Sequence, residues 1–110
     1  STVVQPDVFV LCDEKKNDGK RCIGAPDFVI EVLSPSTGSK DQIKKVSLYE
    51  KHGVREYWIV DPVYQTVITR ILNKEQLFNA PTTYEAEGKL AIAVLDGIEI
   101  NFDLVFRTEP

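Results

Sequence analysis

A single glutamate inside an otherwise apolar, β-branched segment constrains this sequence more than any other feature. Residues 28–33 read Phe-Val-Ile-Glu-Val-Leu, so Glu31 has only apolar neighbours. A carboxylate withdrawn from water is costly unless a cation or hydrogen-bond donors hold its charge. The segment therefore predicts a buried strand in which a cation or hydrogen-bond donors must hold the charge of Glu31.

Further strands and one helix are expected around this segment. Ser39 and Gln42 resemble a capping box and Gly53 supplies a stop, which together predict a helix over residues 40–52. Strands are predicted where short apolar, β-branched runs occur, at residues 7–11, 28–33, 57–60 and 66–72. Segments 82–84, 90–95 and 98–102, with a turn at Asp96-Gly97, predict a carboxy-terminal β-hairpin appendix.

The connections predict how the strands pair. A helical crossover joins residues 28–33 to 57–60, so these strands should be parallel. Residues 7–11 and 28–33 flank a polar segment with an Asn-Asp-Gly turn signal, so they should be antiparallel. If the reversal centres near Asp18 and Gly19, Asp7 lies opposite Ile30 and beside Glu31.

This arrangement predicts metal-assisted chemistry. Two adjacent carboxylates, Asp7 and Glu31, repel each other unless a divalent cation lies between them. At about 100° per residue, Lys45 falls on the helix face that carries Asp41, Leu48, Tyr49 and His52. An amine there can orient or deprotonate a water and stabilise charge on a phosphate. The pattern thus indicates phosphodiester hydrolysis.

Each of these residues also has an ordinary structural interpretation. Glu31 can face solvent from an edge strand, Asp7 can be a turn residue after Pro6, and Lys45 can pair with Asp41. The rival ligand Asp27 lies about 13 Å from Glu31 along the strand, which suits a strand-entry residue better. We expect His52 to be a helix-end charge and Trp58 to be a core residue.

Composition narrows the class of protein. The 110 residues are 43% hydrophobic, which suits one domain spanning residues 1–110. A net charge of -4 argues against a protein that binds nucleic acid through an overall positive charge. Without a long apolar run or a signal peptide, we expect a soluble cytoplasmic protein with no membrane partner. Cys12 and Cys22 are expected to be reduced structural thiols, with a disulfide across the hairpin as the alternative.

Several motifs resemble the Uma2 family, also called DUF820, of restriction endonuclease-like proteins in the PD-(D/E)XK nuclease superfamily. The resemblance rests on Gln5-Pro6-Asp7, on residues 26–37 and 53–62, and on Asp41, Lys45 and Tyr49. It implies an α/β fold with a mixed sheet and an αβββαβ core. It also implies Mg²⁺, or Mn²⁺, bound by Asp7, Glu31 and the main-chain carbonyl of Val32. The superfamily usually has its catalytic lysine at the position of Leu33 here, so the resemblance assigns that role to Lys45.

The resemblance also implies an amino-terminal helix and strand before Gln5 that this sequence lacks. We therefore expect a partial restriction endonuclease-like domain whose exposed apolar surface is shielded by a homodimer, a higher oligomer or strand exchange. The expected function is that of a Mg²⁺-dependent DNA endonuclease. The alternatives are a catalytically inactive dimerising or nucleic-acid-binding module and, less favoured, a metal hydrolase of small phosphoesters.

Overall fold

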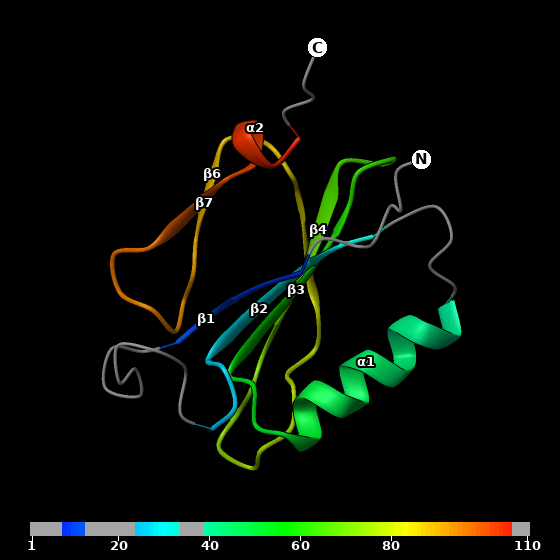
Figure 1. Ribbon diagram of the computed structural model, residues 1–110, viewed down its shortest axis with the longest axis vertical. Coiled ribbons are helices and arrows are strands. Elements are labelled where there is room, and N and C mark those ends of the chain that lie inside the picture. Colours follow the sequence, from blue (N-terminus) through cyan, green and yellow to red (C-terminus); the bar gives the residue numbers. More distant parts are fainter. Residues whose placement is uncertain (1–7, 13–23, 34–38, 107–110) are drawn as a thin grey trace.

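Two apolar strands form the centre of the sheet in the computed structural model (Figure 1). β2 (Phe28–Val32) and β3 (Glu56–Asp61) pair in parallel, with Glu31 opposite Ile59. The structure describes residues 8–12, 24–33 and 39–106, although the side chains of residues 39–41 are not described. β2 and β3 are buried almost throughout because both faces of the sheet are covered.

The main sheet has five strands in the order β1-β2-β3-β4-β5. β1 (Val8–Leu11), β4 (Thr66–Ile71) and β5 (Thr82–Glu85) each pair antiparallel with the preceding or following strand. The helix α1 (Ser39–Lys51) provides the crossover between the two parallel strands. The predicted mixed α/β sheet and its helical crossover are confirmed.

Side chains alternate between the two faces of the sheet. On the helix face, Val29, Tyr57 and Ile59 form an apolar cluster against which Val46 and Tyr49 of α1 pack. The opposite face, which we call the hairpin face, lies under the carboxy-terminal elements β6 (Lys89–Ala91), β7 (Glu99–Asn101) and α2 (Phe102–Val105). The core residues of the hairpin face are Phe28, Ile30, Trp58, Val60, Val67, Ala86, Ile92, Leu95 and Phe102. Trp58 is therefore a core residue, as predicted.

The carboxy-terminal half differs from the prediction in two respects. Residues 82–85 are not part of the hairpin appendix, because β5 pairs with β4 in the main sheet. The appendix is the β6–β7 pair alone, and its strands are shorter than expected, because β6 ends at Ala91 and β7 ends at Asn101. Asn101 caps α2 by accepting a hydrogen bond from Asp103 N at 3.0 Å, so Phe102 begins a helix instead of ending a strand.

The predicted register between β1 and β2 is wrong by two residues. Phe9, not Asp7, pairs with Ile30, and Val8 lies opposite Glu31. The prediction depended on where the chain reverses, and residues 13–23, like Asp7 itself, lie outside the described residues. Strand composition constrains register only through the alternation of faces.

Two smaller expectations also need correction. Cys12, directly after β1, is disulfide-bonded, so the expectation of reduced thiols is wrong for it. Leu48, expected to share the packed side of the helix with Lys45 and Tyr49, is 49% exposed. His52 directly follows α1 and is exposed, which agrees with a charge at the helix end. Among the described side chains of α1, Val46 and Tyr49 pack against the apolar cluster of the helix face, and Lys45 contacts Glu31. None of the helices in the described ranges is long and apolar enough to cross a membrane.

Candidate active site

A buried carboxylate paired with a helix-borne amine lies at the middle of the helix face. Glu31 is fully buried, with an exposed fraction of 0%, and its Oε1 accepts a hydrogen bond from Lys45 Nζ at 2.9 Å. The Lys45 side chain is 34% exposed, so solvent reaches part of it. The sequence prediction that Lys45 faces the sheet near Glu31 is confirmed.

The fold explains why these two residues meet. Glu31 is the fourth residue of β2, flanked by Val8 on β1 and Ile59 on β3, so both sides of its strand are paired. α1 follows β2 in the chain and crosses the same face, which brings its second turn over Glu31. The interpretation of Glu31 as a solvent-facing edge residue is therefore wrong.

The two oxygens of this carboxylate differ in their partners. Among the described residues, nothing within hydrogen-bonding distance satisfies the buried Glu31 Oε2. Buried polar atoms are nearly always paired, so such an atom calls for a donor or a cation. A carboxylate oxygen is the ligand type that Mg²⁺ prefers, and this oxygen fits a metal ligand.

The structure describes only part of the rest of the predicted metal site. Val32 directly follows Glu31 in β2, and Asp7 lies outside the described residues. In the ranges that the structure describes, no group of three or more His, Cys, Asp or Glu side chains is placed to hold a metal ion. Glu31 is thus the one predicted carboxylate ligand whose position is described.

Two tyrosines border the pair, and sequence reasoning gave neither a role. The rings of Tyr49 and Tyr57 lie 4.7 Å apart between α1 and β3. Burial, followed by the negative charge of Glu31, raises the pKa of the Tyr49 hydroxyl, while Lys45 opposes the shift. Burial first and Glu31 second also raise the pKa of Tyr57. Both hydroxyls therefore remain neutral at physiological pH. Their signal in the sequence was limited to helical spacing for Tyr49 and a strand pattern for Tyr57.

Asp27, the rival ligand, has a different partner. It is buried at the start of β2, and its Oδ1 accepts a hydrogen bond from Arg55 Nη1 at 3.2 Å. Its main chain also joins β1 to β3, because Asp27 N donates to Leu11 O and Glu56 N donates to Asp27 O. The interpretation of Asp27 as a strand-entry residue agrees with this position.

Sequence reasoning also missed the buried Glu56 on the hairpin face. Its Oε2 accepts a hydrogen bond from Trp58 Nε1 at 2.6 Å, and its Oε1 accepts one from Val94 N at 3.0 Å. Burial raises the pKa of Glu56, although these hydrogen bonds act in the opposite direction. Glu56 therefore attaches the turn after β6 to β3.

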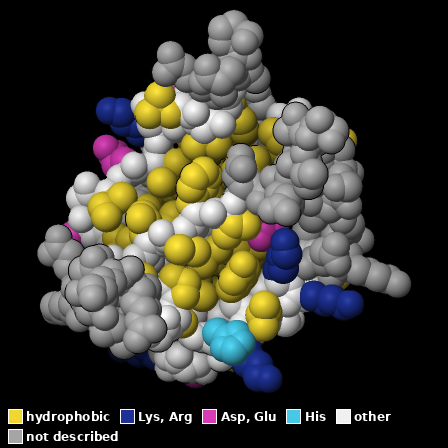
Figure 2. Space-filling view, viewed as in Figure 1, with side chains coloured by type: hydrophobic (Ala, Val, Ile, Leu, Met, Phe, Trp, Pro, Cys, Tyr) yellow, Lys and Arg dark blue, Asp and Glu magenta, His cyan; other side chains and the backbone are white. Residues whose placement is uncertain are grey.

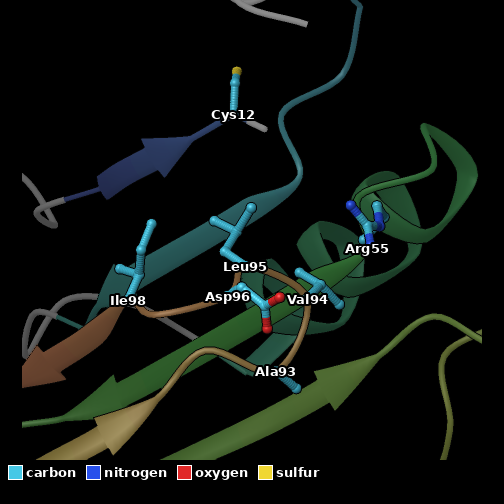
Figure 3. Close-up of a pocket in the computed structure, with 7 residues that line it drawn as sticks. All are labelled: Cys12, Arg55, Ala93, Val94, Leu95, Asp96 and Ile98. Atoms are coloured by element: carbon cyan, nitrogen blue, oxygen red, sulfur yellow. The ribbon is translucent and has the colours of Figure 1, made fainter. Parts of the chain in front are cut away.

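A cavity of about 540 Å³ opens on the same side as this turn, and Figure 3 shows Arg55 and Asp96 among its lining residues. Glu31 and Lys45 do not line it. The cavity is separate from the candidate active site.

Comparisons with known proteins identify the family of this chain and match its fold. The sequence matches the Uma2 family, described as "Putative restriction endonuclease", over residues 1–103. An uncharacterized protein of Synechocystis sp. is 26% identical over 102 residues, which are 93% of this chain and 53% of that protein. The fold resembles the crystal structure of a "putative nuclease belonging to DUF820" from Anabaena variabilis, with a TM-score of 0.60 and 20% identity, covering 88% of this chain and 52% of the other. This chain spans about half the length of each of these relatives. The family match extends over nearly the whole sequence, so the chain belongs to the Uma2 family.

Proposed function

We propose that this chain carries the catalytic centre of a Mg²⁺-dependent nuclease that hydrolyses phosphodiester bonds in DNA. One observation supports the proposal above all. A fully buried Glu31 binds Lys45 through one oxygen and presents the other without a partner among the described residues. An arrangement that only stabilised the fold would be expected to satisfy both oxygens.

The proposed metal ligands are Asp7, Glu31 and the main-chain carbonyl of Val32. These are oxygen ligands, which suit Mg²⁺ and also Mn²⁺. A bound Mg²⁺ supplies Lewis-acid stabilisation of charge on a phosphate oxygen. Glu31 contributes its free oxygen to this site and holds Lys45 through the other.

Lys45 supplies positive charge where the reaction develops negative charge. In hydrolysis, a water oxygen bonds to phosphorus, one ester P–O bond breaks, and the proton that water loses passes to the departing oxygen. In this proposal, the ammonium of Lys45 contacts the phosphate during the exchange; its ion pair with Glu31 and the partial exposure of its side chain support this role. Fixed charges of this kind need no rearrangement when the bond breaks.

Cleavage of plasmid DNA with Mg²⁺ tests the proposal. We expect Glu31→Gln to lower the cleavage rate by at least about 100-fold, because the metal loses a charged ligand. Glu85→Gln in β5, an exposed glutamate, is the matched control and should leave cleavage unchanged. Isothermal titration with Mg²⁺ alone should show weaker binding for Glu31→Gln. Equal cleavage and equal metal binding in the two variants would overturn the proposal.

A second candidate is a dimerising module that keeps the nuclease fold without activity. The specific observation is the edge strand β1, on which Val8, Phe9 and Val10 are 44%, 54% and 54% exposed. Figure 2 shows hydrophobic side chains gathered over the part of the molecule where Figure 1 places β1 and β2. Exposed apolar edge strands readily pair with another chain. We propose that a second copy of this chain pairs with β1, whether or not the protein cleaves DNA.

A further inference from the structure

The turn between β3 and β4 presents the two most exposed large apolar side chains among the described residues. Val63 is 72% exposed and Tyr64 is 77% exposed. Neither belongs to the apolar cluster on the helix face or the one on the hairpin face. A turn after Asp-Pro accepts most residue types, so packing and turn formation both leave these side chains unexplained.

The turn is held in one conformation by its own polar groups. Asp61 Oδ1 accepts hydrogen bonds from Val63 N at 2.9 Å and from Tyr64 N at 3.3 Å. Gln65 has a φ of 51°, and the pairing of Asp61 with Thr66 closes the turn. Tyr64 is therefore displayed from a fixed backbone, which lowers the entropic cost of binding.

This turn lies at the same end of the sheet as the candidate active site. β2 and β3 are parallel, and Leu33 N donates to Val60 O at 2.9 Å, so the two strands end together. Figure 1 shows the turn at the end toward which β2 and β3 run. From the row of Glu31 and Ile59, the start of the turn is about 7 Å farther along the strand. Duplex DNA rises about 3.4 Å per nucleotide of one strand and an unpaired strand is more extended, so this distance corresponds to no more than about two nucleotide steps.

We infer that Tyr64 is a binding residue that stacks against an unpaired nucleobase of the substrate, near the phosphate held at Glu31 and Lys45. An exposed aromatic ring offers a flat apolar face, and every base offers a complementary one. Val63 widens this surface without adding charge. The inference rests on the proposed function, and it adds that the preferred substrate has a single-stranded or unpaired nucleotide beside the cleaved bond.

The test measures binding of a short fluorescein-labelled single-stranded oligonucleotide by fluorescence anisotropy, with Ca²⁺ in place of Mg²⁺. Tyr64→Ala should raise Kd by about 5- to 150-fold, the range that loss of one stacked base produces. Tyr64→Phe should bind like the wild type because it keeps the ring. Tyr84→Ala in β5, a tyrosine that is 44% exposed, is the matched control and should not change Kd.

A second set of oligonucleotides carries one abasic site at successive positions. At the position that stacks on Tyr64, removing the base should weaken wild-type binding and leave the binding of Tyr64→Ala unchanged. An equal loss in both proteins at every position would overturn the stacking inference. The inference would also be overturned if Tyr64→Ala changed the molecular mass of the protein in solution but left Kd for the oligonucleotide unchanged. That result would assign this surface to contact between protein molecules.

The outcomes separate this inference from the function on which it rests. A protein that cleaves DNA but binds it equally well with Tyr64→Ala retains the nuclease proposal and loses the stacking residue. A protein that neither binds nor cleaves DNA contradicts both.

Discussion

Glu31 and Lys45 form an ion pair but differ in burial, and this difference determines how much each partner contributes to stability. Glu31 has lost all contact with solvent, whereas Lys45 keeps about a third of its side chain exposed. The carboxylate has therefore lost far more hydration than the amine, and it depends on Lys45 for the ion pair that holds its charge. Removing the amine should cost more than removing both partners together.

We predict that Lys45→Met lowers the free energy of unfolding by about 1–3 kcal/mol, because it leaves a buried charge uncompensated. Adding Glu31→Gln to this variant should recover part of the loss, since the amide carries no charge. Lys44→Met, at an exposed position beside it in α1, is the control and should change stability little. Urea unfolding at neutral pH measures all three. An equal effect of Lys44→Met and Lys45→Met would contradict the assigned pairing.

At the scale of elements, buried polar groups join units that the strand pattern treats as separate. Lys45 joins α1 to β2, and Glu56 joins β3 to the turn after β6. Trp58 takes part in the second junction through its Nε1, while its ring packs against Phe28 at 5.0 Å and Phe102 at 6.1 Å. The hairpin face is thus closed by both apolar packing and a carboxylate.

The raised pKa of Glu56 predicts an unusual pH dependence of stability. A carboxyl group whose pKa is higher in the folded than in the unfolded state favours folding when protonated. That contribution is fully present below the ordinary pKa of 4.5 and is lost as the pH rises through the raised value. Glu56→Gln removes this ionisation. The free energy of unfolding of the wild type, relative to that of the variant, should therefore increase as the pH falls from about 7 to 4.

Thermal unfolding of Glu56→Gln and wild type at several pH values provides the measurement. The amide can accept only through its single oxygen, so the variant should be less stable in the acid range, where the wild-type carboxyl is protonated. Glu85→Gln, on an exposed glutamate, should run parallel to the wild type at every pH. A stability difference between wild type and Glu56→Gln that is constant with pH would contradict the prediction.

At the scale of the whole molecule, both faces of the sheet are covered, whereas the two edge strands of its described part, β1 and β5, are largely exposed. α1 covers the helix face and the carboxy-terminal elements cover the hairpin face, so the central strands β2 and β3 are buried. In the described part of the chain, β1 is an edge strand with consecutive exposed apolar residues. Association through this edge is the physical route by which a second copy would bury them.

We predict that Phe9→Lys reduces self-association, because a charged side chain on an edge strand opposes pairing with another strand. Light scattering over a range of concentrations should show a dimer for the wild type and a monomer for the variant. Leu104→Lys in α2, at a position that is 63% exposed, is the control and should leave the mass unchanged. A wild type that remains monomeric at all concentrations would exclude association through β1.

Local patterns predicted most of the elements of this fold. The apolar runs at β2, β3 and β4 and the cap and stop signals of α1 located these elements to within a residue or two at each end. They also predicted the parallel pairing of β2 with β3 and the position of Lys45 toward the sheet. These features follow from neighbouring residues, because strand alternation, helix periodicity and capping act over a few positions.

Contacts between distant residues decided the rest. The β1 register, the place of β5 in the main sheet and the junction of Glu56 with Val94 depend on which surfaces meet, and no local pattern encodes that. By itself, the sequence determined that Glu31 lies in an apolar strand, where its charge, once buried, needs a cation or hydrogen-bond donors. Only the tertiary structure decided that Lys45 satisfies one of its oxygens and that the described residues leave the other unsatisfied, because hydrogen bonding depends on distances between atoms that folding sets.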